Sequence, residues 1–308
     1  MNDLRHSSEQ YLELRRALGY KLIGEANLLA SFVAFAETAG VDTVTTRDAV
    51  AWTKSATTGS PAYLARRMRV VRSFARYLRS FDSRTEIPPT NLFPNRKYRP
   101  TPYIYSDAEV IALMMAAAEL SPPLRSATSK TLIGLLAATG MRISEAMNLD
   151  DHDIDWHGGL LVVRDTKFGK SREVLLHAGT VEALKGYAGE RDQLSRHRPN
   201  RSFFVSTRGS RLVHPTVYWT FRQLLRSAGF EQRSGSRQPR VHDLRHTFAV
   251  KTLLGWYRDE KDVAALMPLL STYLGHVDPK ATYWYLTGVP ELLGLAALRL
   301  ESANEKQS

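Results

Sequence analysis

The sequence predicts a mainly α-helical protein of two domains, the second of which contains a small antiparallel β-sheet. Apolar residues recur at helical spacing in both halves of the chain. Prolines and basic residues crowd residues 88–102, and neither a helix nor a sheet interior tolerates prolines at this density. Two short runs, 160–165 and 172–176, have the composition of strands joined by a turn. We therefore expect a helical domain over 1–87, a basic linker over 88–102 and an α-rich domain with the sheet over 103–308.

The first domain is expected to be a bundle of four or five helices. Apolar faces indicate the first two helices and are formed by Tyr11, Leu14, Leu18 and Leu22 and by Leu28, Phe32 and Phe35. Thr45 and Asp48 have the spacing of a capping box before a third helix. Ser60 followed by Pro61 fits the N-cap and first position of a fourth helix.

The fourth helix carries a row of arginines beside its apolar stripe. The row consists of Arg69, Arg72, Arg76 and Arg79, at spacings of three and four. Arginines arranged in this way without interleaved acids can follow a phosphate backbone, and the alternative is a solvated surface face. The basic excess of the chain favours DNA contact.

Composition limits the possible partners and compartments. The chain has 42 Lys and Arg against 31 Asp and Glu, a formal charge of +11, which suits nucleic acid first and an anionic membrane surface second. The absence of cysteine excludes disulfides and thiolate metal sites. The polar first ten residues do not resemble a signal peptide, and the apolar runs are too short to span a bilayer. We expect a cytoplasmic protein that does not interact with a membrane.

The second domain is expected to be mixed in structure. Ser106 and Glu109 form a capping box before its first helix, and Gly140 ends its second helix. Helices are predicted over 106–120, 126–139, 143–149, 179–195 and 215–228, with a helical remainder after residue 240, and a short strand is predicted over 202–206.

Five segments of this domain carry residue types suited to phosphodiester chemistry without a metal. They are Ala138–Glu145, Thr166–Arg172, His242–His246, Leu274–His276 and Tyr285. Arginine forks match phosphate oxygens, and histidines add donors near helix starts. A lysine at a hairpin turn is a movable proton donor, and a tyrosine hydroxyl among cations is a possible nucleophile.

Each segment alone has an ordinary alternative. His242 and His246 could form a metal pair, but no glutamate of a His-Glu-x-x-His motif lies between them, so we expect no metal site. Tyr285 stands among Tyr273, Tyr283 and Trp284, where buried aromatic packing is the common reading.

The order Arg, Lys, His-x-x-Arg, His, Tyr resembles the tyrosine recombinase (phage integrase) family, including the Xer-type resolvases. The resemblance covers about residues 103–295, whereas the first domain resembles the family's core-binding domain only in size, helix content and basic character. It implies the catalytic residues Arg142, Lys167, His242, Arg245, His276 and the nucleophile Tyr285. Family spacing favours Lys167 over Lys170, which would then contact phosphate, and Tyr285 over Tyr283. Glu145 matches a position of structural type.

The resemblance also implies what the protein does. It implies a site-specific recombinase that cleaves and rejoins double-stranded DNA through a 3′-phosphotyrosine and a Holliday junction, without metal or cofactor. It implies a homo-tetramer on DNA, alone or with related recombinases. Two alternatives remain: a type IB topoisomerase, which relaxes plasmids without recombinant products, and an idle DNA-binding partner subunit.

Two features near the C-terminus depart from the simple pattern. The stretch Trp256–Ser271 is longer than the usual connection in the family. Such a stretch is commoner in recombinases borne on mobile elements, and it could shift the nucleophile helix. A nearly all-apolar helix is predicted after Pro290. That tail helix could be buried in its own domain or, as the resemblance implies, dock on a neighbouring protomer.

Overall fold

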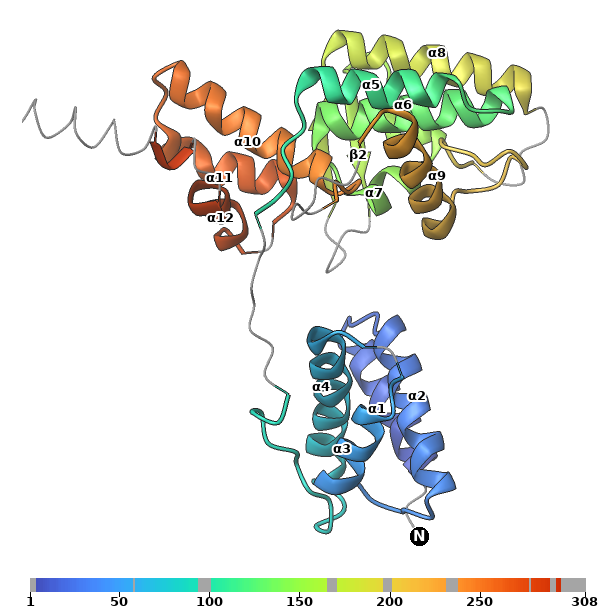
Figure 1. Ribbon diagram of the computed structural model, residues 1–308, viewed down its shortest axis with the longest axis vertical. Helices are drawn as coiled ribbons and strands as arrows, with labels where there is room; N and C mark the ends of the chain where they lie inside the picture. Colours follow the sequence, from blue (N-terminus) through green and yellow to red (C-terminus); the bar gives the residue numbers. More distant parts are fainter. Residues whose placement is uncertain are drawn as a thin grey trace, which may run out of the picture. The chain divides into compact units, whose positions relative to one another are not determined.

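The computed structural model describes residues 4–57, 59–93, 101–164, 171–195, 201–230, 238–276, 278–288 and 292–294. The chain divides into two compact units, Met1–Arg99 and Pro100–Ser308 (Figure 1). The division falls within the segment 88–102 that the prolines indicate as a linker.

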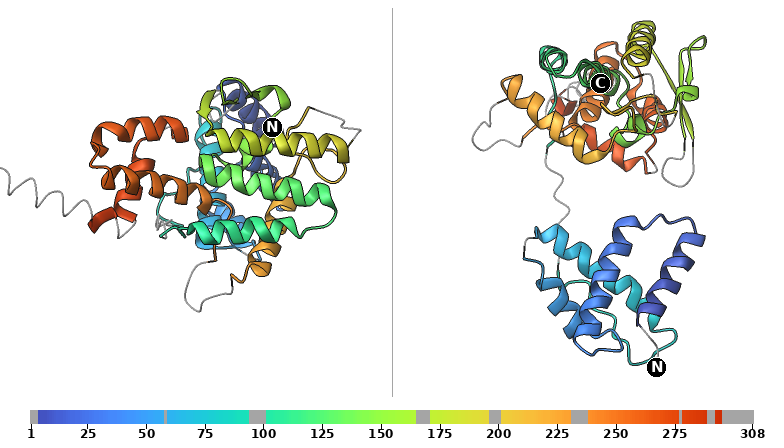
Figure 2. Two further views of the ribbon diagram at one scale, coloured as in Figure 1. Left: turned by 90° about the horizontal axis from the view of Figure 1, so that it is seen from above. Right: turned by 90° about the vertical axis from the view of Figure 1, so that its right-hand side faces the viewer.

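The first unit contains four helices in its described part. They are α1 (Leu4–Ala17), α2 (Ile23–Thr38), α3 (Thr46–Lys54) and α4 (Pro61–Leu78). Their shared core includes Phe32, Trp52 and Phe74, all essentially inaccessible to solvent. The predicted caps are present, because the Thr45 side chain accepts from the Asp48 amide and the Ser60 side chain accepts from the Tyr63 amide. The four helices pack as a bundle (Figure 2).

The second unit is mainly helical, with one small sheet. Its helices are α5 (Asp107–Ala118), α6 (Pro123–Thr139), α7 (Ile143–Met147), η1 (Asp151–Asp153), α8 (Ala178–Leu194), α9 (His214–Ser227), α10 (Asp243–Arg258), α11 (Val263–Leu274) and α12 (Lys280–Gly288). Helices α5, α6 and α8 lie side by side, and α10, α11 and α12 form a second group that joins the first where α10 packs on α6 (Figures 1 and 2). The long stretch Trp256–Ser271 is thus the end of α10, a short connection and most of α11.

The sheet has three antiparallel strands in the order β1 (Ile154–Asp155), β2 (Leu160–Val163) and β3 (Arg172–Leu175). The pairing of β2 with β3 agrees with the predicted hairpin, with Val163 opposite Arg172. Strand β1 was not predicted. The turn that carries Lys167 and Lys170 lies outside the described residues.

The prediction of a strand over residues 202–206 was wrong. Only single bridges occur there, between Asp150 and Ser202 and between Val205 and Arg211. Phe203 and Phe204 are consecutive and both fully buried, whereas a half-buried strand exposes every second side chain. Side-chain packing holds this segment, together with hydrogen bonds from the Phe203 amide to the Leu149 carbonyl and from Arg191 to the Phe203 carbonyl.

Two apolar clusters of the second unit hold the elements that carry the predicted catalytic residues. The larger cluster is built around α6, the sheet and α8, and a smaller one joins α10, α11 and α12. Tyr285 belongs to the smaller cluster, as does Leu292, which is fully buried. Among the described residues, no helix combines the length and the apolar character needed to cross a membrane.

Candidate active site

The site begins at the turn between α6 and α7. Gly140 ends α6 with a left-handed φ of 60°, and a Cβ at this position would lie 2.5 Å from the ring of Phe248. Arg142 follows at the start of α7. Its backbone amide donates to Glu145 Oε2 at 2.8 Å, and its Nη1 donates to Glu145 Oε1 at 2.7 Å. The tight turn and this carboxylate fix the direction of the Arg142 side chain.

Glu145 connects Arg142 to the sheet through a second arginine. Arg172 on β3 donates from Nη1 and Nη2 to the two carboxylate oxygens, at 3.0 Å and 2.8 Å. Burial alone would raise the pKa of Glu145, but the hydrogen bonds and charge of Arg172 and Arg142 lower it to about 2. Glu145 therefore stays ionised and acts as a structural link. Arg172 stands in the hairpin segment that the sequence singled out, but nothing in the sequence indicated this pairing.

Three arginines from different elements hold the C-terminal end of α11. Its last carbonyls have no partner within the helix and need donors from elsewhere. Arg172 Nε donates to the Tyr273 carbonyl at 2.8 Å, Arg245 Nη2 donates to Leu274 at 2.6 Å, and Arg142 Nη2 donates to Gly275 at 2.8 Å. Gly275 has a left-handed φ of 66°, and a Cβ there would meet the Arg172 guanidinium at 2.8 Å. The Leu-Gly-His motif thus has a structural reason as well as a chemical one.

Arg245 is the most deeply placed of these cations. Its side chain is buried on α10, and Nη1 also donates to the Gly140 carbonyl at 2.9 Å. Burial, followed by the nearby charge of Arg142, lowers its pKa to about 10, so it remains charged at neutral pH. A guanidinium has five N–H donors, and the carbonyls leave some of them for a ligand.

Two histidines stand beside the arginines. His242 precedes α10, and burial together with the charges of Arg245 and Arg240 lowers its pKa to about 4. It is therefore neutral at neutral pH. His276 follows α11, and its Nδ1 lies 2.6 Å from Thr282 Oγ1 on α12. This contact ties the end of α11 to the helix that carries the candidate nucleophile.

Tyr285 and Tyr283 occupy different environments on α12. Tyr285 is 2% exposed, its ring stacks on that of His276 at 6.4 Å, and its hydroxyl lies 3.0 Å from His246 Nδ1. Tyr283 is 46% exposed. The structure brings together five of the six predicted catalytic residues, Arg142, His242, Arg245, His276 and Tyr285. Lys167, the sixth, lies outside the described residues.

His246 was considered from the sequence only as half of a metal pair with His242. In the structure their rings meet edge to face at 4.8 Å, and His246 contacts the hydroxyl of Tyr285. The sequence shows that His246 directly follows the predicted catalytic Arg245. It does not show which side of α10 faces α12, so the contact with Tyr285 could not be predicted.

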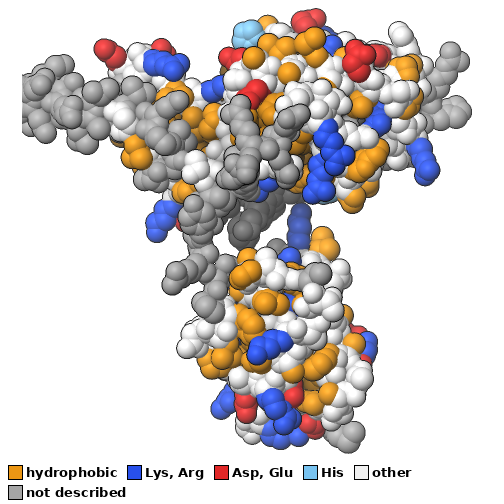
Figure 3. Space-filling model, in the orientation of Figure 1, with side chains coloured by type: hydrophobic (Ala, Val, Ile, Leu, Met, Phe, Trp, Pro, Cys, Tyr) orange, Lys and Arg blue, Asp and Glu red, His pale blue; other side chains and the backbone are white. Residues whose placement is uncertain are grey.

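The arginine row of α4 requires one correction. Arg69, Arg76 and Arg79 are exposed, but Arg72 is buried and is not part of a surface row. Its Nε and Nη2 donate to the carbonyls of Pro88 and Pro89, because the chain after α4 returns along the helix. Burial lowers the pKa of Arg72. On the face drawn in Figure 3, the first unit carries acidic side chains among its basic ones.

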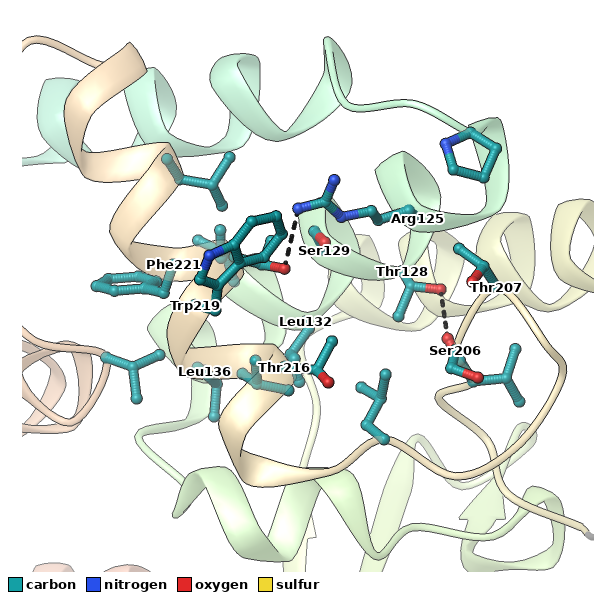
Figure 4. Close-up of a pocket in the computed structure, with 18 of the residues that line it drawn as sticks. Arg125, Thr128, Ser129, Leu132, Leu136, Ser206, Thr207, Thr216, Trp219 and Phe221 are labelled. Carbon is teal, nitrogen blue, oxygen red and sulfur yellow. Dashed lines mark hydrogen bonds between the residues drawn. The ribbon is translucent and has the colours of Figure 1, made fainter.

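An apolar cavity of about 340 Å³ lies between α6 and α9, apart from this cluster. Leu132, Trp219 and Phe221 line it, and Arg125 lies 5.1 Å from the Trp219 ring (Figure 4). None of the predicted catalytic residues that the structure describes lines it. The chemistry therefore belongs to the arginine and histidine cluster and not to this cavity.

Comparisons with known proteins agree with this arrangement. The phage integrase family model matches residues 105–289. The chain is 41% identical over 307 residues to the integrase/recombinase y4rB of Sinorhizobium fredii, which covers 98% of each chain. It is 30% identical over 227 residues to the tyrosine recombinase XerC of Herpetosiphon aurantiacus, covering 72% of this chain and 68% of that protein. The solved structure of the Tn1549 transposon integrase in complex with transposon right end DNA has the same fold, with a TM-score of 0.67. The two chains are 15% identical, and the match covers 96% of this chain and 98% of that one.

Proposed function

The chain belongs to the phage integrase family of tyrosine recombinases, and from this premise we propose that it cleaves and rejoins specific DNA sites through Tyr285. The observation that carries the proposal is the meeting of Arg142, Arg245, His242 and His276 around the Tyr285 helix. Together with Tyr285, these residues come from four separate parts of the catalytic unit, since His242 and Arg245 both stand at the start of α10.

The arginines are suited to hold the scissile phosphate. Arg245 is buried and charged, and Arg142 is fixed by Glu145 and the Gly275 carbonyl. Preorganised donors of this kind stabilise the charge that develops on a phosphate without reorganising during the reaction. His242 is neutral before DNA binds and serves as a hydrogen-bond partner of the phosphate, beside His276.

The energy of the broken phosphodiester bond is retained in a new bond between the DNA phosphate and Tyr285. Tyr285 Oη attacks phosphorus, the bond from phosphorus to O5′ breaks, and the products are a 3′-phosphotyrosine and a free 5′-hydroxyl. Lys167 protonates the leaving O5′. Rejoining reverses these steps when a 5′-hydroxyl from the partner strand attacks the phosphotyrosine, so the chemistry consumes no nucleotide.

The proposed partner is double-stranded DNA, with Lys170 and the exposed arginines of α4 among its backbone contacts. Four protomers join two DNA sites, and strand exchange proceeds through a Holliday junction. The core-binding unit, residues 1–87, and the catalytic unit, residues 103–308, each hold one side of the duplex, and residues 88–102 connect them.

Trapping the covalent intermediate tests the nucleophile. A nicked suicide substrate loses a short fragment after cleavage, so the adduct accumulates and is separated on a denaturing gel. We expect an adduct with the wild-type protein in EDTA and with Tyr283→Phe. Tyr285→Phe removes one oxygen, should keep DNA binding and should form no adduct.

An adduct with Tyr285→Phe but not with Tyr283→Phe would assign the nucleophile to the wrong tyrosine. A strict requirement for a divalent metal would overturn the mechanism. Sequencing the trapped DNA identifies the site, and plasmid relaxation without recombinant products would indicate a topoisomerase instead.

A further inference from the structure

We propose that His246 is a further catalytic residue, which accepts the proton of the Tyr285 hydroxyl through Nδ1 as Oη attacks phosphorus. The inference rests on the proposed function and assigns its proton-transfer step. His246 Nδ1 lies 3.0 Å from Tyr285 Oη, which is hydrogen-bond distance between a base and the atom whose proton it removes.

The surroundings fix both partners of this contact. The His246 ring lies 5.5 Å from the Tyr285 ring and 5.7 Å from that of Trp284, with His242 edge-on at 4.8 Å. Tyr285 is almost fully buried. The hydroxyl is therefore shielded from bulk water, and a nearby side chain is needed to take its proton.

The other two histidines are less suited to this role. His242 has its pKa lowered to about 4 by burial and by Arg245, so it is a weak proton acceptor. His276 directs its Nδ1 to Thr282 Oγ1 at 2.6 Å. His246 has the ring nitrogen that contacts the reacting oxygen.

The proton leaves Tyr285 Oη as this oxygen bonds to phosphorus. In the reacting tautomer His246 carries its proton on Nε2 and presents a lone pair on Nδ1. The bond from Oη to phosphorus forms, the bond from phosphorus to O5′ breaks, and the phenolic proton moves to Nδ1. When the strand is rejoined, His246 returns this proton to Oη. His242 lies against the His246 ring and His276 lies against the Tyr285 ring. The charge of Arg245 favours the developing tyrosinate.

Single-turnover cleavage of the suicide substrate tests the inference with two variants of His246. His246→Asn keeps an oxygen that can accept the hydroxyl hydrogen bond, but an amide does not take a proton. His246→Ala removes the contact. We expect both variants to bind DNA as the wild type does and to cleave about 10²–10⁴-fold more slowly. Added imidazole should restore part of the rate to His246→Ala.

Thr252→Ala is the matched control, because it removes a hydroxyl from the same helix away from Tyr285. It should cleave at the wild-type rate. The wild-type and variant rates are measured from pH 5.5 to 9. The two His246 variants should gain rate as the hydroxide concentration rises and approach the wild type at high pH.

A wild-type rate for His246→Asn would show that His246 only positions the tyrosine, and the inference would be wrong. Failure of the wild type itself to form an adduct would overturn the proposed function instead. The ¹⁵N resonance of His246 Nδ1 provides a readout without DNA. It should shift in Tyr285→Phe, and an unchanged resonance would contradict the contact.

Discussion

Arg142 and Arg172 offer a comparison between a residue proposed to hold phosphate and one that only supports the fold. Both bind Glu145, and each donates to one carbonyl at the end of α11. The three arginines at this helix end also neutralise its partial negative charge. Charge alone therefore does not distinguish a catalytic arginine from a structural one.

Replacement of Arg142 or Arg245 by alanine should lower the cleavage rate by about 10²–10³-fold, because the transition-state charge loses a preorganised donor. DNA affinity should fall far less, since many other basic residues contact the backbone. The measurements are single-turnover cleavage and equilibrium binding, with thermal unfolding to exclude a loss of fold. Equal losses of binding and cleavage would make these arginines ordinary DNA anchors.

His242 should make stability depend on pH. Its folded pKa of about 4 lies below the ordinary value of 6.5, so the unfolded chain binds more protons between these values. The free energy of unfolding therefore rises as pH increases through this window. Between pH 5 and 7 the wild type should gain about 2 kcal/mol more than His242→Gln.

Chemical denaturation at several pH values measures this difference. The window avoids Glu145, whose contribution is present above about pH 4.5 and is lost only as pH falls toward about 2. Identical slopes for the wild type and His242→Gln would show that His242 is not held neutral.

Helix α4 combines a structural arginine with exposed ones. Arg69→Ala and Arg76→Ala should each flatten the log–log salt dependence of DNA binding by about one unit, roughly uniformly across sequences. Arg72→Ala should instead leave the Pro88 and Pro89 carbonyls without their donors. Loss of buried partners of this kind costs roughly 1–3 kcal/mol of stability.

Salt titrations of binding, together with thermal unfolding, separate these effects. Arg47 on α3 is exposed and serves as a control outside the row. If the slopes for Arg69→Ala and Arg76→Ala match that of the wild type, the row is a solvated face and not a DNA contact.

At the scale of the whole molecule, we propose that the predicted tail helix couples neighbouring protomers. The segment after Pro290 lies outside the described residues except for residues 292–294. Leu292 is buried with α10, α11 and α12 in its own chain, so a truncation must keep it. Deletion of residues 295–308 should leave a folded protein that binds a single DNA site.

The truncated protein should lose cooperative assembly and strand exchange, because the apolar residues proposed to dock on a neighbouring protomer have been removed. Gel-shift assays resolve single and paired complexes, and a two-site substrate reports exchange. Unfolding of the truncated monomer would place the tail in its own core and end the proposal of docking in trans.

The sequence by itself determined the features that depend on near neighbours. Side chains three residues apart form the capping box of Ser106 and Glu109, and the two runs that pair as β2 and β3 lie close together in the sequence. The order and spacing of Arg142, His242, Arg245, His276 and Tyr285 also stand in the sequence, which is why the family could be named from it.

Only the tertiary structure decided which groups touch across long separations. Arg142 reaches the Gly275 carbonyl 133 residues away, Arg172 meets Glu145, and His246 meets Tyr285 across 39 residues. Arg72 is buried because the chain returns past it. Local patterns encode hydrogen bonds within one turn, whereas the contact of His246 with Tyr285 depends on how the apolar faces of α10, α11 and α12 pack. The same packing decides which of the neighbouring polar side chains reaches the nucleophile.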